Sequence, residues 1–139
     1  MSNSAWMPRL NDPDQAEDHF RRAVRGGDLT GATALLVCCD TESRPLAHLL
    51  VADCDLDASP SENADVLGML LHAFKRESTP SLAGLALGLT RPGSEQVQHY
   101  DRSWFRACYR VCHQRGLVCH GVYVVTRGRA RAIHIDDAA

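Results

Sequence analysis

The residues with the clearest chemical potential lie in one polar loop and at the start of the helix predicted after it. These residues are Arg91, His99 and Asp101. Imidazole and carboxylate groups can bind metals or move protons, whereas a guanidinium pairs with carboxylates or other anions. Asp101 could instead only cap the helix. Arg91 could pair with Asp101, hold an anionic ligand or lie in solvent. The sequence leaves these alternatives open.

A second set of candidate ligands falls on two consecutive predicted elements. They are Cys108, Cys112, His113, Cys119 and His120. The first two are one helical turn apart, and such spacing could chelate zinc. However, both share the apolar helix face with Trp104, and none of the 6 cysteines of the chain forms a C-x-x-C pair. We therefore predict buried, reduced thiols that behave as small hydrophobes, and no cofactor, with zinc as the disfavoured alternative.

Arginines form a basic stripe along the exposed side of the same predicted helix. The stripe contains Arg102, Arg106 and Arg110, and it could be extended by Arg127, Arg129 and Arg131. Such a stripe could contact the phosphates of a nucleic acid. The formal net charge of the chain is nevertheless -2, which favours a solvated face over a nucleic-acid site.

Alternating helical and strand patterns predict the framework that must position these residues. Helices are predicted from Asp12 to Gly26, from Ser59 to Ser78 and from Asp101 to Gly116, because each begins with capping chemistry and two end at glycine. Apolar runs predict strands at residues 32–39, 46–52, 82–89, 117–126 and 129–135. The order α-β-β-α-β-α-β-β predicts an α/β fold, a three-layer sandwich with a mixed β-sheet.

The 139 residues are enough for one domain, which we place at residues 12–135. Residues 1–11 are predicted to form a flexible tail that Trp6 could tether, and residues 136–139 a second tail. The chain has no apolar run of membrane-spanning length and no signal-peptide pattern, so we expect no membrane partner and a cytoplasmic location.

Several sequence features recur at corresponding places in one known family. They are the turn Asp40-Thr41-Glu42-Ser43-Arg44, the strand-to-loop junction Leu89-Thr90-Arg91-Pro92-Gly93, the helix opening at Asp101 and its closing glycine Gly116, and the strand from Val118 to Thr126. With them, the chain resembles the JAB/MPN metalloprotease fold, which has a cytidine-deaminase-like architecture, and its RadC-like branch most closely. The resemblance covers residues 31–135.

The resemblance implies a zinc site from which most ligands are missing. In the family, two histidines and an aspartate bind zinc, and a glutamate acts on the zinc-bound water. Here the histidine positions fall on Leu89 and Arg91. If the loop is taken to be one residue shorter, the residues at these positions are again not metal ligands. The glutamate position falls near His48, and only Asp101 matches. The resemblance thus implies a vestigial pocket of His48, Arg91, His99 and Asp101, with no metal and no catalytic residue.

Inactive members of this family serve as protein-binding scaffolds, often by pairing with another such domain. By this resemblance we expect a pseudoenzyme, a JAB/RadC-like protein-interaction module that binds a protein partner or forms a homo-oligomer. Its surface would be the helix with Trp104, Arg102, Arg106 and Arg110, or the last strand.

Two alternative functions remain. One alternative is a metal-dependent, isopeptidase-like hydrolase rebuilt around His48, His99 and Asp101. Another is a nucleic-acid-associated accessory protein. The chain contains no nucleophile elbow, no phosphate-binding glycine loop and no H-x-E deaminase motif.

Overall fold

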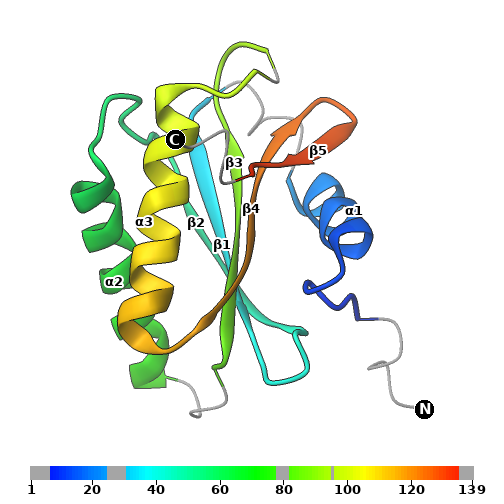
Figure 1. Cartoon of the computed structure of the whole chain (residues 1–139), viewed down its shortest axis with the longest axis vertical. Coiled ribbons are helices and arrows are strands. Elements are labelled where there is room, and N and C mark those ends of the chain that lie inside the picture. The colour runs from blue at the N-terminus through cyan, green and yellow to red at the C-terminus, as the bar shows by residue number, and fades with distance from the viewer. Residues whose placement is uncertain (1–6, 25–30, 78–81, 95, 135–139) are drawn as a thin grey trace.

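The computed structural model describes residues 7–24, 31–77, 82–94 and 96–134. Its elements follow one another as α1 (Pro13–Ala23), β1 (Thr33–Cys39), β2 (Pro45–Val51), α2 (Pro60–Glu77), β3 (Gly84–Thr90), α3 (His99–Arg115), β4 (Val118–Thr126) and β5 (Arg129–Ala132) (Figure 1). The predicted α/β class is therefore confirmed. None of the helices in these residues is both long enough and apolar enough to span a membrane.

The strands form one mixed sheet of five strands in the order β2-β1-β3-β4-β5. Neighbouring strands are antiparallel except for β3 and β4, which are parallel and are joined through α3. Every residue of β1 and β3 is buried. This double-sided burial explains why both strands read as continuous apolar runs rather than as alternating patterns.

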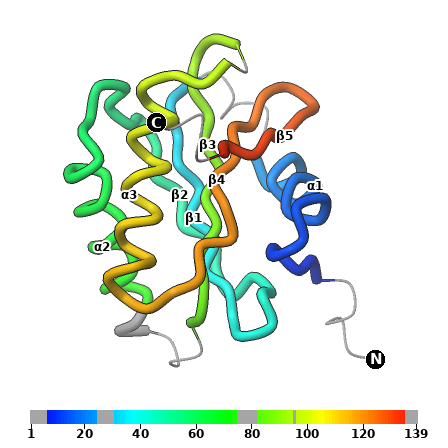
Figure 2. Tube along the Cα trace, viewed as in Figure 1, coloured from blue at the N-terminus to red at the C-terminus, as the bar shows by residue number. Residues whose placement is uncertain are grey.

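Helices cover both faces of the sheet. α2 and α3 lie on one face, and α1 lies on the other (Figures 1 and 2). Each face has its own core, one built around Trp104 and Leu87 and the other around Phe20 and Val37. Gly88 allows close packing of α1, because a Cβ at this position would lie 2.5 Å from a ring carbon of Phe20.

The sequence correctly identified the caps of the first two helices. The carboxylate of Asp12 accepts hydrogen bonds from the backbone N–H groups of Asp14 and Gln15 at the start of α1. At the start of α2, the Ser59 hydroxyl accepts from the Glu62 N–H, and the Glu62 carboxylate accepts from the Ser59 N–H, both at 3.1 Å. This reciprocal pair is a capping box.

Two predicted boundaries need correction. α3 begins at His99 rather than at Asp101, because Gln98 is the N-cap and Asp101 lies in the first turn. Leu10 is fully buried, and its N–H donates to the Ser43 carbonyl at 2.8 Å, so it belongs to the folded body and not to a flexible tail. The predictions for Trp6, for the glycines at 26–27 and for residues 136–139 lie outside the described residues.

Candidate functional site

Arg91 and Asp101 meet at the junction between β3 and α3 in a buried ion pair. Both side chains have 0% exposure. The Arg91 Nε donates to Asp101 Oδ1 at 2.9 Å, and Nη2 donates to Oδ2 at 2.7 Å. Two parallel, charge-assisted bonds of this kind fix both groups in one orientation. The interpretation of Arg91 as a solvated loop arginine is therefore wrong.

The same pair organises the loop between the strand and the helix. Arg91 Nη1 donates to the Ser94 carbonyl, and Nη2 donates to the Gln96 carbonyl at 2.8 Å. Asp101 Oδ2 also accepts the Gln98 N–H at 2.9 Å. The loop thus wraps around the guanidinium, and protein groups engage both carboxylate oxygens. Neither side chain can bind a metal or an anion without breaking these contacts.

Hydrogen bonds also close the junction on the side of β1. The hydroxyl oxygens of Thr90 and Thr33 lie 2.5 Å apart, and the Thr90 hydroxyl contacts the Gly31 carbonyl oxygen at 2.9 Å. The phenol of Tyr100 donates to the Thr33 carbonyl at 2.7 Å. Tyr100 and Thr90 are buried, so the end of β3 is packed at this side of the junction.

His48 does not join Asp101, contrary to the predicted pocket. His48 lies on β2 and points toward α1, where its Nε2 is 2.7 Å from Nε2 of His19. Asp101 lies on α3, on the opposite face of the sheet. Burial lowers the pKa of His48, and burial followed by the charge of His48 lowers the pKa of His19. No short-range sequence signal predicts this contact, because the two histidines come from different elements.

His99 lies apart from both groups, because it is exposed at the first position of α3. Of the four residues of the predicted pocket, Arg91 and Asp101 are the two that bond to each other in the described part of the chain. The site that would combine His48, His99 and Asp101 for metal hydrolysis is not formed in this structure.

Trp104 cannot belong to the predicted interaction surface, because it is only 1% exposed and packs in the core between α3 and the sheet. The three arginines of the helix lie toward its outer side. Arg102 is half-buried and Arg106 is exposed, while Arg110 donates to the Ser61 hydroxyl on α2 at 2.9 Å. The arginine stripe is therefore a surface feature that in part links α3 to α2.

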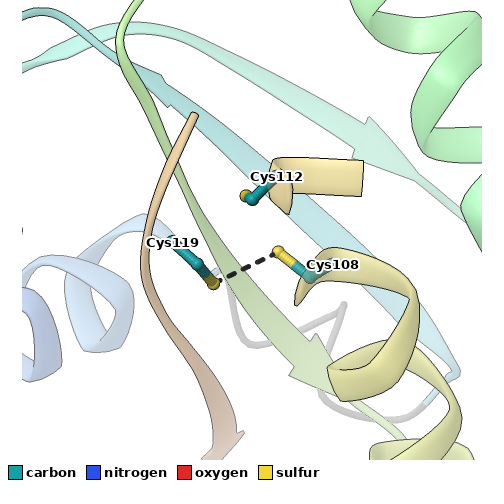
Figure 3. Close-up of side chains that lie close together, drawn as sticks. All are labelled: Cys108, Cys112 and Cys119. Atoms are coloured by element: carbon teal, nitrogen blue, oxygen red, sulfur yellow. Dashed lines mark hydrogen bonds between the residues drawn. The ribbon is translucent and has the colours of Figure 1, made fainter. Parts of the chain in front are cut away.

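Cys108, Cys112 and Cys119 form a compact cluster between α3 and β4 (Figure 3). Their sulfur atoms all lie within 4.8 Å of one another, and the Sγ atoms of Cys108 and Cys119 are 3.8 Å apart. Cys108 and Cys112 lie on successive turns of the buried face of α3. The chain then turns at Gly116, in a left-handed conformation with φ 66°, and brings the half-buried Cys119 back beside them.

The sulfur of Cys119 accepts several hydrogen bonds. The thiols of Cys108 and Cys112 lower its pKa to about 3, with further help from the Gly121 N–H and the Tyr109 phenol. Hydrogen bonds with Cys112 and Cys119, together with burial, raise the pKa of Cys108. Contacts within the cluster thus lower the pKa of Cys119 and raise that of Cys108.

From the sequence, core packing of these cysteines is the favoured prediction, and zinc chelation is the disfavoured alternative. The structure shows that the three side chains are clustered, with Cys108 and Cys112 buried and Cys119 half-buried. Among the described residues, this is the only group of three or more metal-ligating side chains close enough to hold an ion, and neither His113 nor His120 belongs to it. Tyr109 contacts Cys119, but no sequence pattern indicated that it lies beside the cysteine cluster.

No protein-family model matches the chain, and no curated protein matches it.

Proposed function

We propose that this chain is a non-catalytic protein-interaction module built on a JAB/RadC-like framework. The observation that carries the proposal is the buried ion pair of Arg91 and Asp101. In the resembled family the junction between strand and helix holds a metal, whereas here a guanidinium and a carboxylate neutralise each other at this place. A buried pair of this kind stabilises a loop conformation, but it leaves no ligand position for a reactive water.

The proposal also assigns the interaction surface, which is the outer edge of β2. Within the described residues β2 pairs only with β1. The side chains of Leu46 and Leu50 are 42% and 50% exposed, and they share one face of the strand with His48. α1 lies mainly against β4 and β5 and reaches β2 through the contact of His19 with His48, so Leu46 and Leu50 on either side of His48 stay exposed. The segment Pro45–Val51 contains no charged residue. Natural edge strands are usually protected by charges, so a long apolar edge indicates association.

The occupant that fits this edge best is a second copy of the chain. A two-fold axis would pair β2 with β2 of the other copy in antiparallel orientation and would bring Leu46 and Leu50 of both copies together. No charge repulsion opposes this pairing. At the other edge of the sheet, β5 is only 4 residues long and offers a shorter pairing edge than the 7 residues of β2. We therefore favour β2 over the last strand and over the Trp104 helix. The proposal places this homodimer in the cytoplasm, where the six free cysteines stay reduced.

Light scattering during size-exclusion chromatography tests the proposal. We expect the wild-type chain to have twice the mass of one chain, and Leu46→Glu/Leu50→Glu to have the mass of a single chain. Four buried glutamates at a symmetric interface would repel one another and would lack partners. Circular dichroism should show that the double variant keeps its fold, because both side chains are already exposed in the monomer.

Met69→Glu is the matched control, since Met69 is 72% exposed on α2, on the other face of the molecule. This variant should retain the mass of the dimer. A wild-type chain that is monomeric at every concentration would overturn the proposed homodimer. A double glutamate variant that stays dimeric would exclude the β2 edge as its interface.

A further inference from the structure

We propose that Cys108, Cys112 and Cys119 form a binding site for one thiophilic metal ion with a filled d shell, either Zn²⁺ or Cu⁺. The inference is independent of the proposed dimer, because the cysteines lie between α3 and β4 and not at the edge of β2. The site is also distinct from the junction of Arg91 and Asp101, which lies at the other end of α3.

The spacing of the sulfur atoms matches such an ion. A Zn–S bond is about 2.3 Å long, which places two sulfurs of a tetrahedral site about 3.8 Å apart. Cys108 and Cys119 already have this separation, at 3.8 Å. All three sulfurs lie within 4.8 Å of one another, so small changes of side-chain rotamer would bring the third into range. Figure 3 shows the three side chains converging from α3 and β4 on one point.

The surroundings of the cluster suit thiolate ligands. The Gly121 N–H and the Tyr109 phenol both donate to the sulfur of Cys119. Ion binding would displace the thiol protons of the cluster and release them to solvent. The contacts from Gly121 and Tyr109 would then orient a metal-bound sulfur, as outer hydrogen bonds do in known metal sites.

The donor set selects the class of ion. Three sulfur donors without an oxygen ligand favour soft ions such as Cu⁺ and Zn²⁺ over Mg²⁺ and Ca²⁺. Cu⁺ could be held by three thiolates alone. Zn²⁺ would take a fourth ligand from water, and the half-buried Cys119 together with Tyr109, which is 44% exposed, gives solvent a route to that position.

Titration of the full-length chain, stripped of metal and kept reduced, tests the inference. In one arm Co²⁺ serves as a spectroscopic probe for the Zn²⁺ site. We expect a sulfur-to-cobalt charge-transfer band that saturates at one ion per chain and disappears when Zn²⁺ is added. In the other arm, Cu⁺ is titrated against a coloured Cu⁺ chelator. Tight binding at one ion per chain in the cobalt arm identifies the ion as Zn²⁺, and such binding in the copper arm identifies it as Cu⁺.

Cys119→Ser should weaken binding by more than about 100-fold, because loss of a ligand exceeds the effect of losing an outer contact. The matched control is Cys54→Ser, a half-buried cysteine outside the cluster, and it should bind like the wild type. Tyr109→Phe should shift the cobalt spectrum while the stoichiometry stays at one. The wild-type titration does not depend on any variant folding. Failure of both ions to bind the wild type at one per chain would overturn the inference, and so would binding that survives Cys119→Ser.

Discussion

At the scale of single residues, the junction of Arg91 and Asp101 shows what a sequence can and cannot reveal. The pairing of the two side chains was one predicted alternative, because opposite charges in one loop attract each other. Their complete burial could not be predicted, since it depends on the path of the loop through Ser94, Gln96 and Gln98. Burial makes the pair important for stability, because an unpaired charge costs far more free energy in the interior of a protein than at its surface.

Removal of the negative charge from this pair should be costly. We expect Asp101→Asn to lower the free energy of unfolding by about 3–5 kcal/mol, because it leaves the buried charge of Arg91 uncompensated. Urea unfolding followed by circular dichroism measures the change. The apolar double variant Arg91→Met/Asp101→Leu should lose less than the single variant, because no unpaired charge remains buried.

The comparison for this prediction is Asp18→Asn, which removes an exposed partner of Arg21 and Arg22 on α1. Exposed pairs contribute only about 0–1 kcal/mol, so this change should have little effect. An Asp101→Asn variant as stable as Asp18→Asn would show that the buried pair does not hold the junction together.

At the scale of elements, the helices and strands were largely predictable, whereas their exact starts and neighbours were not. Asp101 was predicted as an N-cap, but it lies in the first turn of α3 and accepts the N–H of Gln98. Both positions favour aspartate for the same reason, namely the unpaired N–H groups at a helix start, so composition alone cannot separate them.

The predicted pocket placed His48 beside Asp101. Side chains alternate along β2, however, so His48 points to the face opposite to that of Ala47 and Leu49.

The contact of His19 with His48 links α1 to β2 and should make stability depend on pH. The pKa of both side chains is lowered from 6.5 in the folded state, mainly by burial. The unfolded chain therefore binds protons at a higher pH than the folded chain. Their contribution to stability is fully present above pH 6.5 and is lost as the pH falls through the lowered pKa values of the folded state.

Urea unfolding at a series of pH values between about 7.5 and 5 checks this prediction. We expect the free energy of unfolding of the wild-type chain to fall more steeply with decreasing pH than that of His19→Gln/His48→Gln. Parallel curves for the two proteins would show that the histidine pair does not couple protonation to folding.

At the scale of the whole molecule, the sequence predicted the α/β class and the buried character of β1 and β3. It could not predict the strand order, because a continuous apolar run shows that both faces are covered but not which strands lie beside it. It also could not show which part of a face a helix covers. α1 packs mainly against β4 and β5 and reaches β2 through His19, and the resulting exposure of Leu46 and Leu50 became visible only in the folded chain.

Amide hydrogen exchange at increasing protein concentration is the most direct test of the account. If β2 pairs with a second copy, the amides of residues 46–51 should exchange more slowly as the chain becomes more concentrated, while those of Arg129–Ala132 stay unchanged. In Leu46→Glu/Leu50→Glu the exchange of the β2 amides should not depend on concentration. Exchange of β2 in the wild-type chain that is the same at all concentrations would contradict the proposed role of this edge.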